Sequence, residues 1–211
     1  MADKLQIGEA STDWRETLLR VRPDIVSLAT PASLRLEALQ AAAELGCHLF
    51  CDKPLGATAE GAEAAYRAAD RAGVKHAYAS THRYGPGVAW VTELLSGGAI
   101  GRVRETVATF RSGLPSLLPW SWAMVLATGG GMLNNAATHM FGIFERCLDG
   151  EIARAAGTAD LRSSKAPYLP EIHDFRDGWR YQAVIDAIRG SRSWSEVPAA
   201  ASGLRQTAAA F

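Results

Sequence analysis

A lysine follows a short apolar run in the segment Cys51-Asp52-Lys53-Pro54-Leu55. If the run is a strand of a parallel sheet, Lys53 stands at its carboxyl end, where open parallel sheets bind their ligands. Burial there would lower the pKa of the lysine and let it exchange protons near neutral pH, while Pro54 would restrict the backbone beneath it. On position alone, a surface lysine in a polar turn is the simpler interpretation.

A second candidate is a glycine triplet followed by polar side chains. Gly129, Gly130 and Gly131 allow close approach of the backbone to a ligand at the start of a helix. Asn135 and His139 come next, four residues apart, so a helix places both on one face. An imidazole with a hydrogen-bonding neighbour one turn earlier suits general acid/base catalysis. A flexible loop followed by a partly buried histidine fits the same spacing.

A third polar segment, Ser80–Tyr84, follows the last of three predicted strands and contains Arg83. It either lines the same ligand crevice or links two domains. Cys47, His48 and Cys51 are metal-ligand types, but strand alternation places His48 on the opposite face from the cysteines, and zinc needs further ligands. The sequence contains no Ser-His-Asp signature, phosphate-binding P-loop or G-x-G-x-x-G.

The composition is that of a soluble globular protein and argues against several classes of function. Of the 211 residues, 48% are hydrophobic and 21% charged, and 22 basic residues balance 22 acidic ones. Zero net charge argues against nucleic acid or an anionic membrane as the main partner. No apolar run approaches the roughly 20 residues that span a bilayer, and three cysteines do not make a disulfide framework. We therefore expect a cytoplasmic protein without membrane or nucleic-acid partners.

The elements that must position these side chains alternate between helix and strand through residue 80. Apolar runs rich in β-forming residues predict strands, and apolar residues at helical spacing predict helices. The predicted helices are Trp14–Arg22, Ser33–Leu45 and Thr58–Ala72, and Ser33 is expected to cap the second of them. The predicted strands are Asp24–Thr30, Cys47–Cys51 and Lys75–Ser80, and the first of them is expected to be buried on both faces. Such alternation indicates βαβ units and a parallel sheet.

The sequence beyond residue 80 is richer in helix than in strand. Its predicted helices are Gly87–Leu95, Met132–Leu148, Trp179–Ile188 and Pro198–Phe211, and its predicted strands are Gly101–Arg111, which is half-solvated, and Ile152–Leu161. Pro167–Asp177 is predicted as a solvated loop. The fold class is therefore α/β, with a partial parallel sheet followed by a reduced α+β domain.

Taken in order, these segments resemble the glucose–fructose oxidoreductase / inositol dehydrogenase / rhizopine-catabolism (Gfo/Idh/MocA) family. The run from Pro23 to Gly73 is similar to the second half of the family's Rossmann pattern, in which a D-x-V-x-x-x-T-P strand precedes a strand that ends in E-K-P. Ser96–Val103 and the helix that carries Asn135 and His139 also stand in the expected places.

The resemblance implies a partial Rossmann-like nucleotide-binding domain over residues 1–80 and an abbreviated α+β substrate domain over residues 81–211. Members of the family typically oxidise or reduce a secondary alcohol of a sugar, inositol or related polyol with NAD or NADP. We therefore expect either cofactor, with a small sugar or polyol as substrate. Hydride transfer belongs to the nicotinamide, so the protein has to orient the C–H bond and move the hydroxyl proton.

The resemblance also implies roles for single residues. Lys53 matches the lysine of the E-K-P motif, which touches nicotinamide and substrate, and His139 matches the histidine that exchanges the hydroxyl proton. Asn135 stands where many members have Asp and a subset has Asn. A lysine and a histidine that converge on one oxygen can share the task, one accepting the proton and the other supporting the alkoxide. The residues implied at the cofactor are Thr30, Pro31, Asp52, Lys53, Pro54 and Arg83.

Several positions depart from the family pattern. Asp52 replaces the usual Glu, and Gly142 stands where an Asp often follows the histidine. Ala32 and Arg35 replace the Asn and His common in T-P-N-x-x-H. Only 23 residues precede Asp24, too few for the family's glycine-loop unit. We therefore expect a chain truncated at its N-terminal Rossmann unit and abbreviated in its C-terminal sheet.

Two main hypotheses follow. The first is an NAD(P)-dependent oxidoreductase of a sugar-like secondary alcohol, in which Lys53 and His139 handle the proton. The alternative is a non-catalytic or cofactor-deficient relative that acts as a binding or partner subunit. A sheet without its first unit exposes apolar surface. Either a second copy in a homo-oligomer or another partner covers that surface, or the chain is a fragment of a longer gene product.

Overall fold

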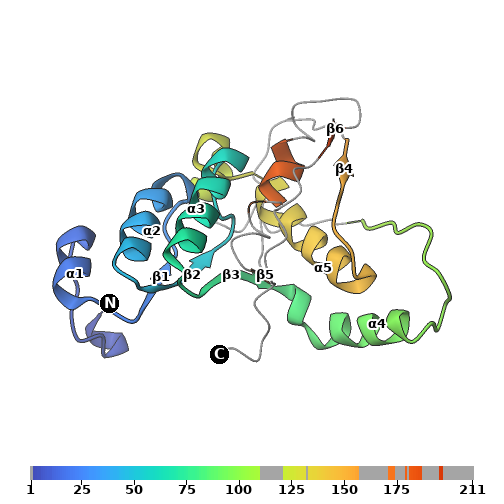
Figure 1. The fold of residues 1–211 in the computed structure, drawn as a ribbon, viewed down its shortest axis with the longest axis horizontal. Helices are drawn as coiled ribbons and strands as arrows, with labels where there is room; N and C mark the ends of the chain where they lie inside the picture. The colour runs from blue at the N-terminus through green and yellow to red at the C-terminus, as the bar shows by residue number, and fades with distance from the viewer. Residues whose placement is uncertain are drawn as a thin grey trace.

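Helices and strands follow one another in a row from α1 at one end of the molecule to α4 and α5 at the other (Figure 1). This computed structural model describes residues 2–109, 121–131, 133–156, 171–173, 179, 181–186 and 195–196. The helices are α1 Trp14–Val21, α2 Arg35–Glu44, α3 Ala59–Ala72, α4 Pro86–Ser96 and α5 Thr138–Leu148, and residues 181–186 are also helical. The strands are β1 Ile25–Leu28, β2 His48–Asp52, β3 His76–Thr81, β4 Arg154–Ala155, β5 Glu171–His173 and β6 Ser195–Glu196.

Three parallel strands form the centre of the fold. β2 lies between β1 and β3, with Ile25 opposite His48 and Cys51 opposite Tyr78. A helix lies in each connection, α2 between β1 and β2 and α3 between β2 and β3, as parallel pairing requires. The predicted α/β class with a parallel sheet is therefore confirmed.

A short fourth strand joins this sheet from much later in the chain. β5 runs antiparallel to β3, with His173 opposite Tyr78. The solvated loop predicted over Pro167–Asp177 is therefore wrong at residues 171–173, since three residues are too few to show the alternation that marks a strand. The predicted domain boundary at residue 80 stays a prediction.

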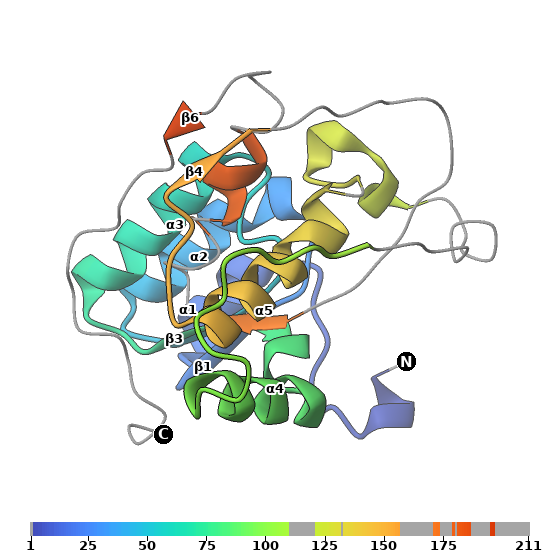
Figure 2. The ribbon, with the colours of Figure 1, turned by 90° about the vertical axis from the view of Figure 1, so that its right-hand side faces the viewer.

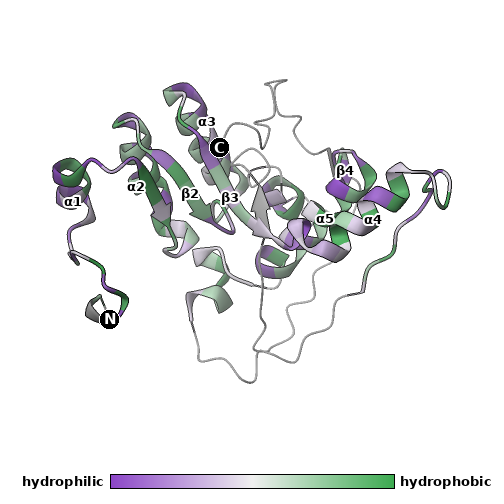
Figure 3. Ribbon diagram, turned by 90° about the horizontal axis from the view of Figure 1, so that it is seen from below, coloured by the Kyte–Doolittle hydropathy of each residue, from purple (hydrophilic) through white to green (hydrophobic). Residues whose placement is uncertain are grey.

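Helices α2 and α3 pack against each other and against one face of the sheet (Figures 1 and 3). Many of the buried side chains at this contact are alanines, which let the helices approach closely and fill the core without side-chain entropy loss. The buried side chains at this contact include Ala42 and Leu39 of α2, Ala62, Ala65 and Ala69 of α3, and Leu49 and Cys51 of β2. The ends of α3 agree with the predicted range Thr58–Ala72. Thr58 caps the helix by accepting a hydrogen bond from the Gly61 amide, and the next residue after the range, Gly73, closes it at φ 64°.

The start of α2 differs from its prediction. Pro31 precedes a 3-10 turn over Ala32–Leu34, and α2 begins only at Arg35, without a side-chain cap. Ser33 therefore does not cap the helix, because the chain leaving Pro31 enters the tighter turn directly. As a result Arg35 points into the core, whereas Leu34 is 67% exposed.

The opposite face of β1 and β2 is open. Ile25 and His48 are paired on this face and both are exposed, as are Ser27 and Phe50 one pair further along. The prediction that the strand Asp24–Thr30 is buried on both faces is wrong, because α2 and α3 lie on the same side of the sheet. The predicted homo-oligomer, in which a second copy would cover such a surface, stays a prediction.

Helices α4 and α5 pack side by side beyond β3 (Figure 2). The strand predicted over Gly101–Arg111 is wrong for residues 101–109, which pair with no strand in the described part of the chain; residues 110–111 lie outside it. Alternating apolar residues form a strand only where another strand supplies hydrogen bonds. No described helix is both long enough and apolar enough to cross a lipid bilayer.

The later predicted elements are described only in part. Of the strand expected over Ile152–Leu161, only β4 is present in the described residues, paired antiparallel with β6. The helix predicted over Trp179–Ile188 agrees with the helical residues 181–186. The helix predicted over Pro198–Phe211 lies outside the described residues.

Two leucines, one on α2 and one in the turn before it, test where the core lies. Leu39 is fully buried and Leu34, just before α2, is largely exposed. We expect Leu39→Ala to lower the free energy of unfolding by about 2–5 kcal/mol, because it leaves a cavity. Leu34→Ala is the matched control and is expected to change it by less than about 0.5 kcal/mol. Urea denaturation of both variants measures the difference, and equal losses would contradict this packing.

Candidate active site

Lys53 follows the last residue of β2 and turns inward. Its side chain is buried, with 7% of the residue exposed. Its ammonium donates a hydrogen bond to Asn135 Oδ1 over 2.9 Å. The peptide bond to Pro54 is cis. The interpretation of Lys53 as a surface lysine is therefore wrong, and the position at the carboxyl end of a parallel strand is confirmed.

Only one orientation of the Asn135 side-chain amide matches the hydrogen-bond donors and acceptors around it. It lies in a π-helical turn, Leu133–Ala137, that leads directly into α5. Its Nδ2 donates to the carbonyl oxygens of Ala123 and Gly131, at 2.8 and 3.1 Å. Because a lysine ammonium has only donors, the acceptor Oδ1 must be the atom that faces Lys53.

His139 lies in the first turn of α5 and is 2% exposed. Neither of its ring nitrogens has a hydrogen-bond partner in the described part of the molecule. The His82 and His139 rings pack in a T-shaped arrangement, with ring centroids 4.8 Å apart and planes at 80°. Because an unpaired buried polar atom is costly, both nitrogens keep hydrogen-bonding capacity for a polar group that reaches them.

Burial sets the proton affinity of both groups. It lowers the pKa of Lys53 from 10.5 to about 8; the neighbouring Asp52 carboxylate opposes this shift and the Arg35 guanidinium adds to it. Burial also lowers the pKa of His139 to about 2, with further repulsion from Lys53 and His82. His139 is therefore a neutral imidazole near pH 7, whereas Lys53 can gain or lose its proton close to neutral pH.

The glycine triplet serves the packing of the chain itself. A Cβ on Gly130 would lie 2.5 Å from the carbonyl oxygen of Trp122, and one on Gly129 would lie 2.7 Å from Ala32 Cβ. Gly131 donates from its amide to the carbonyl oxygen of Ala123. The triplet is therefore neither a flexible loop nor a surface left open for a ligand. It brings the Trp122–Met124 turn against the residues that hold Asn135.

The residues predicted at the cofactor lie near the carboxyl ends of β1, β2 and β3. Thr30 and Pro31 follow β1, Asp52 is the last residue of β2, and Pro54 follows Lys53. Arg83 lies in a 3-10 turn after β3, with its guanidinium 5.8 Å from the Tyr84 ring. Three strand ends therefore contribute, as in sheets that bind ligands at this edge.

Arg35 also belongs to this region, although its sequence context predicts no role for it. It is completely buried, and its guanidinium donates to the carbonyl oxygens of Thr30, Asp52 and Pro54. The available signal was a charged residue one turn before Leu39, on the buried face of a helix. A lone arginine within an apolar stripe is unusual enough to suggest a specific partner.

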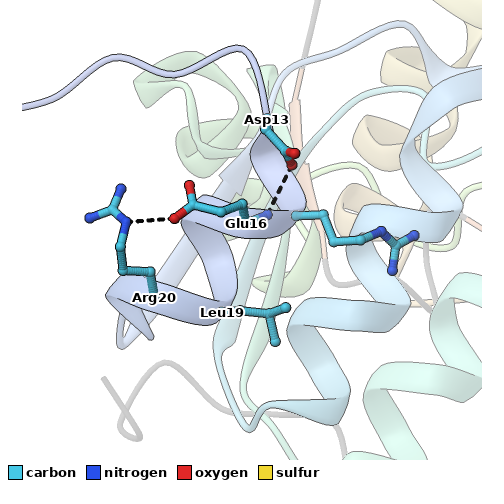
Figure 4. Close-up of a pocket in the computed structure, with 5 residues that line it drawn as sticks. Asp13, Glu16, Leu19 and Arg20 are labelled. Carbon is cyan, nitrogen blue, oxygen red and sulfur yellow. Dashed lines mark hydrogen bonds and ion pairs between the residues drawn. The ribbon is translucent and has the colours of Figure 1, made fainter.

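Neither a surface depression along α1 nor a metal site offers an alternative functional site among the described residues. A shallow depression of about 490 Å³ lies along α1, lined by Asp13, Arg15, Glu16, Leu19 and Arg20 (Figure 4). Glu16 pairs with Arg20 and Asp13 caps the helix, so these groups already have partners. Among the described residues, no three His, Cys, Asp or Glu side chains gather to hold a metal ion.

Comparison with known proteins decides the family. A family model described as "Oxidoreductase family, NAD-binding Rossmann fold" matches residues 1–80, and the GFO/IDH/MocA C-terminal domain matches residues 88–186. The chain belongs to the Gfo/Idh/MocA family. The recognition made from the sequence is thus confirmed, and so is the Rossmann-like character of the parallel sheet.

Several Gfo/Idh/MocA proteins are similar to this chain. Levoglucosan dehydrogenase of Pseudarthrobacter phenanthrenivorans is 35% identical over 156 residues, which cover 72% of this chain and 40% of that protein. D-glucoside 3-dehydrogenase of Escherichia coli is 30% identical over 145 residues, 66% of this chain and 40% of that protein. A solved structure of levoglucosan dehydrogenase with NADH and levoglucosan has a TM-score of 0.60 at 31% identity, over 72% of this chain and 42% of that one. The chain thus spans about 40% of the length of these relatives.

The depressed pKa of Lys53 predicts a pH-dependent stability. The unfolded chain holds this proton up to about pH 10.5, whereas the folded chain releases it near pH 8. The free energy of unfolding is therefore expected to rise between these two pH values, by at most about 3 kcal/mol from this group. In Lys53→Met this contribution to the rise in unfolding free energy is lost, which urea denaturation at a series of pH values between these two would show. Lys75→Met, an exposed control, keeps the wild-type slope, and an unchanged slope in Lys53→Met would contradict burial of the ammonium.

The packing of the triplet gives a second prediction. Gly130→Ala places a methyl group against the backbone of Trp122 and Ala123, and we expect a loss of about 1–3 kcal/mol of unfolding free energy. Gly8→Ala adds the same group in open space and serves as the control. Thermal and chemical denaturation measure both. A Gly130→Ala protein as stable as Gly8→Ala would show that the close approach is absent.

Proposed function

We propose that this chain takes part in NAD(P)-dependent oxidation or reduction of a secondary alcohol in a sugar or polyol. The observation that carries the proposal is the shared burial of Lys53, Asn135 and His139, with Lys53 bonded to Asn135 and electrostatically coupled to His139. Relatives named for levoglucosan and for D-glucosides support a sugar-like substrate with several hydroxyl groups.

The residues at the strand ends suit the nicotinamide end of the cofactor. Lys53 stands at the carboxyl end of β2, and the unsatisfied nitrogens of His139 lie among the same buried groups. When bound, the nicotinamide accepts or donates the hydride. The side chains proposed beside it are Thr30, Pro31, Asp52, Lys53, Pro54 and Arg83. Because the chain contains no G-x-G-x-x-G, we assign none of its residues to the pyrophosphate.

Lys53 and His139 are proposed to divide the handling of the hydroxyl proton. A base works best when its pKa is close to the working pH, which favours Lys53, with a pKa of about 8, as the group that accepts the proton. The N–H of the neutral His139 ring would donate a hydrogen bond to the hydroxyl oxygen and so orient the hydroxyl proton toward Lys53. Once protonated, the Lys53 ammonium would stabilise negative charge that remains on the substrate oxygen.

Asn135 is proposed to hold the lysine in both protonation states. Its Oδ1 can accept a hydrogen bond from either an ammonium or a neutral amine, and its Nδ2 already donates to two carbonyl groups. A carboxylate in its place would favour the charged lysine and raise its pKa. The asparagine therefore helps to keep the lysine able to lose its proton near neutral pH.

The test is turnover of this chain with NAD⁺ or NADP⁺ and a panel that includes levoglucosan, a D-glucoside, D-xylose and an inositol. Formation of the reduced nicotinamide is followed by absorbance. We expect the oxidation rate to rise with pH to a plateau with a midpoint near 8, because the neutral amine of Lys53 is the active form. Lys53→Met and His139→Phe are each expected to lose about 100-fold or more in rate.

Two controls keep this test decisive. Lys75→Met removes an exposed lysine that takes no part in the site and is expected to keep the wild-type rate. Cofactor binding, measured by nicotinamide fluorescence, separates a lost binding site from a lost proton acceptor. Absence of binding at millimolar NAD or NADP would remove the proposal for this chain. Cofactor or sugar binding without Lys53-dependent turnover would favour the binding-subunit alternative.

A further inference from the structure

Arg35 bonds to the backbone on both sides of Lys53. Its Nη1 donates to the carbonyl oxygens of Asp52 and Pro54, the second over 2.6 Å. Its Nε donates over 2.6 Å to the carbonyl oxygen of Thr30, which follows β1. The residue is 0% exposed, and none of the carboxylates in the described residues pairs with it. Apart from a 3.8 Å contact between Nη1 and the Cys51 sulfur, its hydrogen bonds in the described part of the chain are all to main-chain oxygens.

The shape of the guanidinium suits this task. Its donors lie in one plane at set angles, so the carbonyl groups that they reach are held in a defined relation to one another. Two of these groups belong to the residues before and after Lys53, and the third belongs to the neighbouring strand end. A lysine in place of Arg35 carries the charge but not the planar fork.

We propose that Arg35 is a positioning residue that holds Lys53 in place by binding the carbonyl groups of Asp52 and Pro54 and tying them to Thr30. The proposal rests on the proposed role of Lys53 in proton transfer and extends it to a residue on α2. Arg35 does not touch the substrate side of the site in this scheme. It acts by restricting the backbone from which the lysine projects.

The guanidinium also acts on Lys53 through its charge. Among the described residues, three charged or titratable groups are shown to act on Lys53 or to feel its charge. Asp52 favours the ammonium, Arg35 disfavours it, and His139 is neutral near pH 7. Asn135 is uncharged. Removing Arg35 thus removes one source of repulsion and loosens the backbone, and both changes favour a protonated, more exposed lysine.

The test measures the proton affinity and accessibility of Lys53, and needs no turnover. The full chain is treated with an amine-reactive ester from about pH 6 to about pH 11, and modification of Lys53 is quantified by mass spectrometry with Lys75 as internal reference. The pH midpoint reports the proton affinity, and the rate at high pH reports accessibility. Wild type, Arg35→Met and Arg35→Lys are compared with Leu39→Ala, which is buried one turn further along α2 and makes none of the carbonyl bonds.

For Arg35→Met we expect a midpoint raised by about one pH unit and a high-pH rate raised by about threefold or more. Arg35→Lys keeps the charge, so its midpoint stays closer to the wild type while its high-pH rate rises. Leu39→Ala, although less stable, keeps both wild-type values. A midpoint and rate in Arg35→Met that equal those of Leu39→Ala would overturn the proposal. If Arg35→Met does not fold, an unchanged high-pH rate in Arg35→Lys would overturn it. Because catalysis is not measured, failure here is distinct from failure of the proposed function.

Discussion

The hydrogen bond between Lys53 and Asn135 joins two parts of the chain that are 82 residues apart in sequence. One partner projects from the end of the parallel sheet and the other from the turn that starts α5. Both groups have left water, so each depends on the other to satisfy its polar atoms. His139 lies in the first turn of α5, directly after the turn that carries Asn135, so its position depends on the same contact. The site is therefore a junction between the sheet and α5.

The sheet supports its side of this junction through close packing of small residues. Alanines on α2 and α3 let both helices lie tightly against β2, and this places the start of α2 beside the strand end. Arg35 at that start then reaches the main chain around Lys53. On the other side, the glycine triplet allows the Trp122–Met124 turn to reach the amide of Asn135. Burial on both sides accounts for the lowered pKa of the lysine.

Local sequence signals predicted the elements that have their own start and stop residues. α3 lies between Thr58 and Gly73 as expected, and the spacing of Asn135 and His139 correctly placed both residues at the start of one helical segment. The predicted strands before and after α3 are also present, each shifted by one residue. In these cases the physical cause lies within a few residues, so the sequence contains it.

Features that depend on distant partners could not be predicted in this way. Nothing near Gly130 in sequence shows that the Trp122 carbonyl approaches it, and nothing near Glu171 shows that β3 supplies a partner. The alternation after Gly101 was misleading for the same reason, since a strand needs a neighbour. Arg35 was visible as a departure from the family pattern, but its three carbonyl acceptors come from two separate strand ends.

The π-helical turn Leu133–Ala137 has a consequence for how this site tolerates change in chain length. A π-turn contains one residue more than the α-helical turn that it interrupts. Because the extra residue is absorbed within one turn, deleting a single residue there would restore a regular helix and leave the segments on either side nearly in phase. The side chains inside the turn, Asn135 among them, would shift, whereas α5 and His139 would keep their direction. The extra residue therefore lets this turn set the direction of Asn135 separately from the helix that carries His139.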